Sequence, residues 1–147
     1  MIRLAGISDV PAIQEMIKSI PGLWDENWRS DVVERAIISG DAIALVHLEG
    51  DTIDGFLCSH DVAFRGYLSE LVVSPSAQRK GIGGRLLAEA ERRLSERGCA
   101  LVVADVWRDA EGFYLAQGWS APQVVLLRKR LVASTALSEG DRKATPN

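Results

Sequence analysis

Residues 71–84 read LVVSPSAQRKGIGG and join an apolar, strand-like run to a glycine-rich turn. Pro75 ends the apolar run, because proline cannot donate to a strand's hydrogen-bond ladder. Beyond the turn, apolar residues recur at helical spacing and predict a long amphipathic helix that Gly98 caps: Leu86, Leu87, Ala90 and Leu94. The segment is therefore predicted to be a strand, a tight turn and a helix N-terminus.

This turn has the chemistry of an anion-binding site. At a helix N-terminus, several backbone N–H groups lack intrahelical partners and meet the positive end of the helix dipole. Gly81 and Gly83 allow the backbone to approach a ligand closely and to adopt a positive φ. Arg79, Lys80 and Arg85 add positive charge beside those amides. The combination suits a pyrophosphate.

Two well-known phosphate-binding motifs are excluded. The GxxxxGK[ST] pattern fails because no Lys-Ser or Lys-Thr follows the glycines. The dinucleotide pattern GxGxxG fails because Leu86 stands where its third glycine is required, and no acidic ribose-binding residue follows in the expected strand context. An ordinary strand-to-helix turn, with glycines only for tightness, remains the structural alternative.

The rest of the chain alternates between helical and strand periods. Helices are predicted over residues 9–20, after Ser30 as far as Gly40, and from Asp109 to about Gly118. Strands are predicted at residues 2–4, twice within 41–64, and at 67–75, 99–107 and 123–132. The order is β-α-α-β-β-β-α-β-α-β. We therefore expect one α/β domain over residues 1–132, with a mixed central sheet flanked by helices, and a disordered tail at 133–147.

Composition excludes several classes of protein. The chain has 147 residues, a net charge of −3 and 47% hydrophobic residues, which is typical of one soluble domain. No apolar run approaches the roughly 20 residues of a membrane helix, and no secretory signal opens the chain. The negative charge argues against a nucleic-acid partner. Cys58 and Cys99, like His47 and His60, lack metal-ligand spacing, so we expect no metal and a cytoplasmic location.

Two linked motifs point to a family. The first is Val73-Ser74-Pro75 followed by QRKGIG at 78–83, and the second is AEGFYLAQGW at 110–119. In this order they resemble the GNAT family of acyl-CoA-dependent N-acyltransferases. The element order also matches that family's single-domain fold, and the resemblance covers residues 1–131.

The resemblance implies an acetyl-CoA site. The backbone of the strand end would pair with the pantetheine arm like an added strand, a role that falls on Leu71, Val72 and Val73. A backbone N–H near Val72 or Val73 would meet the oxyanion of the tetrahedral intermediate. The turn would hold the pyrophosphate through Gln78, Arg79, Lys80, Gly81, Ile82, Gly83 and Gly84.

The resemblance also assigns catalytic residues. Tyr114 matches the family's general acid, which protonates the leaving thiolate, and Glu70 is the leading general base. A buried structural tyrosine and a solvent-facing carboxylate are the alternatives. Asp105, which interrupts an apolar run, and His60 are further candidates for the base. Many relatives carry Asn seven residues before the tyrosine, where this chain has Trp107, so cofactor contact is expected to differ there.

The segment between the first two helices is expected to wall the acceptor site. Its aromatic faces and carboxylates suit a cationic amine, carried by a small molecule or a peptide: Trp24, Asp25, Glu26 and Trp28. The alternative is that one Trp packs in the core and the acids are solvated.

The predicted function is N-acetyltransfer from acetyl-CoA to a primary amine. Because no cysteine lies near the motifs, direct attack in a ternary complex is expected. The alternative is a non-catalytic acyl-CoA-binding regulatory module. Since the family often pairs through its C-terminal strands, the resemblance also allows a homodimer.

Overall fold

The computed structural model describes residues 1–131, and the chain divides into two compact units, residues 1–111 and 112–147. Short 3₁₀ turns at Ile7–Asp9, Pro75–Ala77 and Arg108–Ala110 join some of the elements. The first unit holds β1 (Ile2–Leu4), α1 (Val10–Ser19), α2 (Val32–Ile38), β2 (Ala42–Glu49), β3 (Thr52–Asp61), β4 (Gly66–Val73), α3 (Ile82–Glu96) and β5 (Val102–Ala104). The last helix, α4 (Glu111–Ala116), enters the second unit.

The sheet has the strand order β1-β2-β3-β4-β5. All neighbours are antiparallel except β4 and β5, which are parallel. The parallel ladder runs only from Gly66 opposite Val102 to Leu68 opposite Ala104. Beyond Leu68, β4 continues to Val73 after β5 has ended. One edge of the second half of β4 therefore carries no strand of the described sheet.

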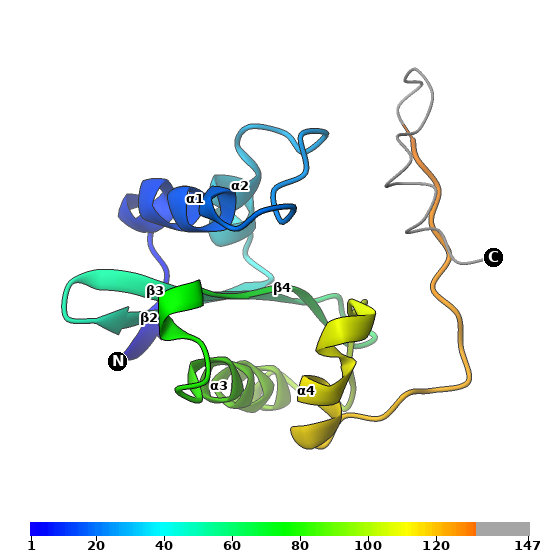
Figure 1. The fold of residues 1–147 in the computed structure, drawn as a ribbon. Helices are drawn as coiled ribbons and strands as arrows, with labels where there is room; N and C mark the ends of the chain where they lie inside the picture. The colour runs from blue at the N-terminus through cyan, green and yellow to red at the C-terminus, as the bar shows by residue number, and fades with distance from the viewer. Residues whose placement is uncertain (132–147) are drawn as a thin grey trace. The chain divides into compact units, whose positions relative to one another are not determined.

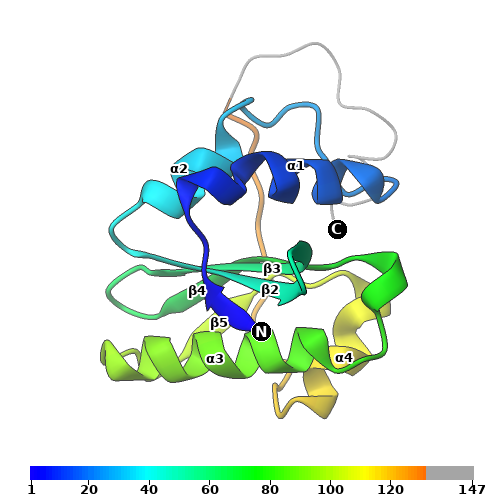
Figure 2. The same cartoon turned by 90° about the vertical axis from the view of Figure 1, so that its left-hand side faces the viewer.

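Helices cover both faces of the sheet. In Figures 1 and 2, α1 and α2 lie on one face and α3 lies on the opposite face. Ile13 and Met16 of α1 pack with Ala44 and Val46 of β2, alternate residues that share one face of the strand. On the other face α3 comes so close that a Cβ at Gly66 would lie 2.7 Å from Leu94 Cδ1.

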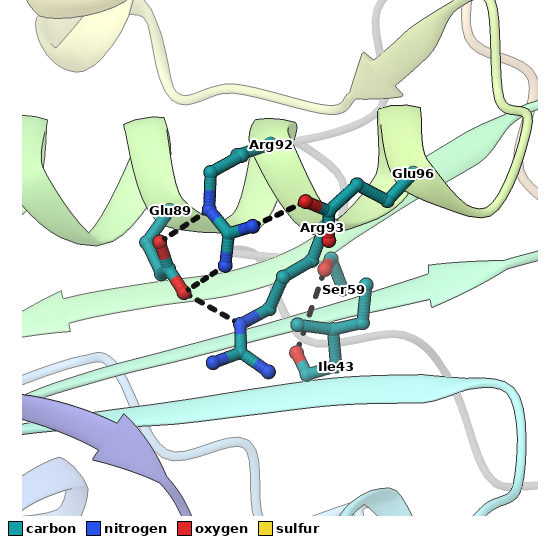
Figure 3. Close-up of polar contacts among 6 residues, drawn as sticks. All are labelled: Ile43, Ser59, Glu89, Arg92, Arg93 and Glu96. Carbon is teal, nitrogen blue, oxygen red and sulfur yellow. Dashed lines mark hydrogen bonds and ion pairs between the residues drawn. The ribbon is translucent and has the colours of Figure 1, made fainter.

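The exposed side of α3 is an ion-pair network (Figure 3). Arg92 donates to Glu89 at 2.8 and 3.0 Å and to Glu96 at 2.5 Å, and Arg93 Nε donates to Glu89 at 2.7 Å. The two guanidiniums hold the pKa of Glu89 well below its usual range, at about 2. These arginines are therefore matched within their own helix, and surface pairs of this kind add little stability each.

The predicted order of elements is confirmed up to α4, but the final strand is not. We expected a strand at 123–132, and its described residues 123–131 form neither strand nor helix. Val124, Val125 and Leu127 are 74%, 79% and 85% exposed. A β-prone composition forms a strand only when a neighbouring strand supplies hydrogen bonds and packing. The predicted tail at 133–147 lies outside the described residues.

None of the helices in residues 1–131 combines the length and the apolar character that crossing a membrane requires.

Candidate active site

One side of the end of β4 carries no neighbouring strand of the described sheet. Ser74 N donates to Asp54 O on β3 at 2.8 Å. Because successive residues of a strand direct their N–H and C=O groups to opposite edges, those of Val73 and Leu71 point away from β3. Consistent with this, Val73 O accepts a bond from the side-chain amide of Gln78 at 3.2 Å. The predicted pantetheine-pairing strand therefore presents its free edge where β5 has ended.

The glycine-rich turn leads directly into α3, as predicted. Gly81 is the N-cap, with φ 75° and ψ 10°, and no side chain caps the helix there. Nothing lies within 4 Å of a Cβ at Gly81, so its backbone conformation alone calls for glycine. Arg79 also has a positive φ, 65°, which the sequence did not indicate, whereas Gly83 lies inside α3. The first-turn amides of this 15-residue helix can receive a pyrophosphate.

A polar cluster lies on the α1–α2 face of the sheet, beside that edge. Glu70 is directly opposite Cys58 across β3 and β4, and Tyr67 is opposite His60. The thiol of Cys58 and Nε2 of His60 lie 3.5 Å apart, which places the two pairs on one face. Cys58 belongs to the core cluster formed with α1, and this identifies the face.

A β-bulge makes this arrangement. The register passes from Cys58 opposite Glu70 to Ser59 opposite Leu68, so Ser69 is an extra residue on β4. Its hydroxyl donates to Cys58 O at 3.0 Å. In a regular strand, residues three apart face opposite sides of the sheet, whereas the extra residue brings Tyr67 and Glu70 to the same side.

The electrostatics of the cluster favour proton exchange at neutral pH. Burial, with the nearby negative charge of Asp105 as the second cause, raises the pKa of Glu70 from its ordinary 4.5 to about 7. The Tyr67 hydroxyl donates to Asp105, and burial together with this bond raises the pKa of the phenol. Burial lowers the pKa of His60. A carboxylate that titrates near pH 7 is well suited to general base catalysis.

Cys58 corrects one expectation. From the sequence, no cysteine was expected near the motifs, yet its side chain lies directly across from Glu70. The residue is 1% exposed, and burial raises the pKa of its thiol to about 11. At neutral pH the group is a protonated, inaccessible thiol and therefore a poor nucleophile.

The predicted acceptor wall lies on the same face of the sheet. Trp24 and Trp28 pack edge to face, with ring centroids 5.4 Å apart, and are partly buried against the core. The ammonium of Lys18 lies 4.6 Å from the Trp24 ring centroid. Asp25 accepts a bond from Asn27 N at 2.8 Å, which closes its own loop. Glu26 is exposed.

Tyr114 lies in an aromatic stack of the second unit. Its ring meets those of Phe113 and Trp119 edge to face, at centroid distances of 5.0 and 5.2 Å. Trp119 N donates to Tyr114 O at 3.1 Å, just after Gly118 with φ 90°. The motif GFYLAQGW thus folds as a short helix closed by a glycine turn. In the first unit, Trp107 is 67% exposed.

A cavity of about 350 Å³ lies away from the predicted residues, at the β1–β2 edge of the sheet. Its lining includes Ile37 of α2, Ile43 of β2 and Arg93 and Arg97 of α3. In residues 1–131, no three His, Cys, Asp or Glu side chains gather as metal ligands would.

Sequence reasoning missed two parts of this site. Nothing in the sequence indicates that the Tyr67 hydroxyl donates to Asp105. The bulge at Ser69 also left no signal, because serine is compatible with a regular strand. Asp105 did leave one, since a charge inside an apolar run needs a partner.

Comparisons with known proteins agree with the fold. A transcriptional regulator from Bacillus halodurans C-125 matches with a TM-score of 0.75 at 20% identity, covering 88% of this chain and 99% of that one. The PaiA N-acetyltransferase from Thermoplasma acidophilum, solved with coenzyme A, gives 0.70 at 23% identity, covering 85% and 92%. The aminoglycoside N-acetyltransferase AAC(6')-Iy, solved with a CoA-containing bisubstrate analogue, gives 0.74 at 17% identity, covering 88% and 97%.

At these identities the structural matches show a shared fold, and they confirm the predicted fold class. A search of curated protein sequences finds no match. A model of the acetyltransferase (GNAT) family matches residues 11–119. Because this match spans most of the chain and includes both predicted motifs, the protein belongs to the acetyltransferase (GNAT) family.

Proposed function

We propose that this protein transfers an acetyl group from acetyl-CoA to a primary amine by direct attack in a ternary complex. The observation that carries the proposal is Glu70, a partly buried carboxyl group on β4 whose pKa of about 7 suits a general base. It lies beside the free strand edge that ends at Val73 and leads into the glycine-rich turn. Base, strand edge and anion-binding turn are thus consecutive along the chain.

The acyl carrier would bind along that edge. The outward backbone groups of Leu71 and Val73 would pair with the pantetheine amides, with Val72 between them packed into the core. Gln78 would first release Val73 O, because its side-chain amide now occupies that acceptor. The pyrophosphate would rest on the turn formed by Gln78, Arg79, Lys80, Gly81, Ile82, Gly83 and Gly84. Two structural neighbours were solved with CoA or a CoA analogue, which supports this assignment.

The protein's residues would move two protons during the reaction. The amine attacks as the free base, after its ammonium form has lost one proton to water. As its nitrogen bonds to the thioester carbon, its acidity rises sharply and Glu70 accepts a second proton. When the carbon–sulfur bond breaks, the thiolate takes a proton from Tyr114, the residue at the family's general-acid position. The products are an N-acetyl amine and free CoA, and the two side chains return to their starting states by exchange with water. The outward backbone N–H of Val73 would stabilise the oxyanion, because that of Val72 points toward β3.

We further propose a cationic acceptor. The ammonium of Lys18 already lies over the Trp24 ring, and this contact supports a role for the aromatic face in binding a positive charge. Trp28, Asp25 and Glu26 would complete the wall. The aminoglycoside acetyltransferases among the structural neighbours support a small-molecule amine. We take residues 1–132 as the functional domain. Its two free cysteines suit a reducing cytoplasm.

The test is release of free thiol from acetyl-CoA across a panel of amines, followed by the variant Tyr114→Phe. The proposal expects amine-dependent release, and a fall in kcat of about a hundredfold in Tyr114→Phe with little change in acetyl-CoA affinity. Calorimetric binding of acetyl-CoA without turnover on any amine would refute the enzymatic proposal and favour the non-catalytic binding module. Full activity in Tyr114→Phe would refute the assigned general acid.

A further inference from the structure

One hydrogen bond ties β4 to the segment that follows β5. The Tyr67 hydroxyl donates to the carboxylate of Asp105. Tyr67 stands opposite Val103 in the middle of the three-pair parallel ladder, and Asp105 directly follows Ala104, where that ladder ends. The bond therefore lies where β5 ends and β4 continues without it.

Asp105 is also the charged neighbour of Glu70. After burial, its negative charge is the second cause of the raised pKa of Glu70. Within residues 1–111, no ion pair includes either carboxylate. Two further titratable groups share this face, both on β3. The thiol of Cys58 stays protonated, and the lowered pKa of His60 leaves its imidazole neutral at pH 7.

No charge of the helical layer is among the causes of the raised pKa of Glu70, which are burial and the negative charge of Asp105. The core cluster around Cys58 includes apolar and aromatic side chains of α1, α2 and the segment between them. The phenol of Tyr67 is neutral, and its raised pKa keeps it so over the working range. Among the residues that the structure describes, Asp105 is the charged side chain that contributes to the raised pKa of Glu70.

We propose that Tyr67 and Asp105 are positioning residues for the base Glu70: the Tyr67 hydroxyl fixes the Asp105 carboxylate where β4 and β5 separate, and this fixed charge governs how Glu70 exchanges its proton. The inference rests on the proposed function, since it concerns the base of the acetyl transfer. Neither residue touches the reacting atoms in this scheme. Asp105, weighed above as an alternative base, acts here through Glu70.

Two conservative variants separate the charge from the hydrogen bond. Asp105→Asn removes the charge but keeps an oxygen that can accept from Tyr67. Tyr67→Phe keeps the charge and the ring but removes the donor. Combining them shows whether Tyr67 acts through Asp105. In the Asp105→Asn background the Tyr67 hydroxyl has no charged partner to fix, so its removal should have no further effect.

The experiment measures Glu70 itself and its catalytic consequence. Carbon-13 NMR of labelled glutamate side chains gives the titration midpoint of Glu70, with its signal assigned by its loss in Glu70→Gln. In Asp105→Asn we expect this midpoint to fall by up to about one pH unit, because burial, the larger cause, remains. The ratio of kcat/KM at pH 6 to that at pH 8.5 should then rise about fivefold. Tyr67→Phe should give a smaller fall, and the double variant no more than Asp105→Asn alone.

The matched control is Asp51→Asn. Asp51 is an exposed residue in the β2–β3 turn, roughly 20 Å along β3 from the partner of Glu70. The Asp51→Asn substitution removes the same net charge as Asp105→Asn and should leave the titration midpoint of Glu70 unchanged.

The outcomes are separable. If the wild-type protein acetylates an amine but Asp105→Asn leaves the Glu70 midpoint unchanged, the inference is wrong and the proposed function stands. If Tyr67→Phe lowers only the melting temperature, with the wild-type pH profile, Tyr67 is purely structural and the inference is again wrong. If the wild-type protein transfers no acetyl group to any amine, the proposed function fails, whatever the NMR titration gives.

Discussion

Replacing Glu70 with glutamine should make the protein more stable at alkaline pH while it removes the proposed base. The pKa of Glu70 is about 7 in the folded protein and 4.5 ordinarily, so the folded state holds its proton more tightly than the unfolded chain does. Where the folded state binds more protons, stability falls as pH rises. The contribution of protonated Glu70 is therefore fully present below about pH 4.5 and is lost as pH rises through 7.

The size of this effect follows from the same two values. A tenfold difference in proton affinity corresponds to about 1.4 kcal/mol, so ionising Glu70 in the folded state costs about 3 kcal/mol more than in the unfolded chain. Glutamine has nearly the same shape and does not ionise. Relative to the wild type, Glu70→Gln should gain about 3 kcal/mol between pH 4.5 and pH 8.5.

Urea unfolding at these two pH values, followed by tryptophan fluorescence, measures the difference. With an m-value of about 2 kcal/mol/M, the midpoint of Glu70→Gln at pH 8.5 should exceed that of the wild type by about 1.5 M more than at pH 4.5. Glu15→Gln, at an exposed position of α1, is the matched control. An equal stability difference at both pH values, or a gain that Glu15→Gln reproduces, would refute the reasoning.

Three further predictions concern the backbone and the core. Gly81→Ala should lose about 1–2 kcal/mol of stability in denaturation experiments and weaken acetyl-CoA binding in calorimetry, because φ is 75° at this position. Gly40→Ala is the control, since Gly40 is equally open within 4 Å but has no positive φ, and it should change neither stability nor binding. Gly66→Ala should lose roughly 1–3 kcal/mol, and a double-mutant cycle with Leu94→Ala should show a loss smaller than the sum. Asp9→Asn should lower the free energy of unfolding by about 1–3 kcal/mol at pH 7 and by less at pH 3, because the hydrogen bonds that Asp9 accepts hold its pKa below the usual range. An equal loss of stability at the two pH values would contradict this prediction.

The sequence predicted the elements whose signals are local. The helical spacing of Leu86, Leu87, Ala90 and Leu94 and the glycines before it sufficed for α3 and its turn. The run at 123–132 failed because a strand depends on a partner elsewhere, which composition does not encode. The strand expected at 99–107 shortened to three residues for a related reason, since β5 pairs with β4 only that far.

The candidate site shows the same division. Glu70 and the turn were found from motifs on one stretch of chain. Cys58 was judged remote because sequence distance was the only measure, whereas the β3–β4 register places it across from Glu70. The bond from Tyr67 to Asp105 joins residues 38 positions apart, and only the three-dimensional pairing of β4 with β5 brings them together.

Because of the bulge at Ser69, the number of residues in β4 decides which side of the sheet each side chain faces. Deleting that one residue would leave every functional side chain in the sequence, yet it would restore strict alternation and turn Tyr67 and the residues before it over relative to Glu70. Either the base or the tyrosine would then point at the apolar α3 layer. If a sequence alignment of relatives places a gap in β4 one position away from the bulge, it would assign these side chains to the wrong face of the sheet in the same way. For relatives of this chain, the length of β4 is thus as informative as the residues it carries.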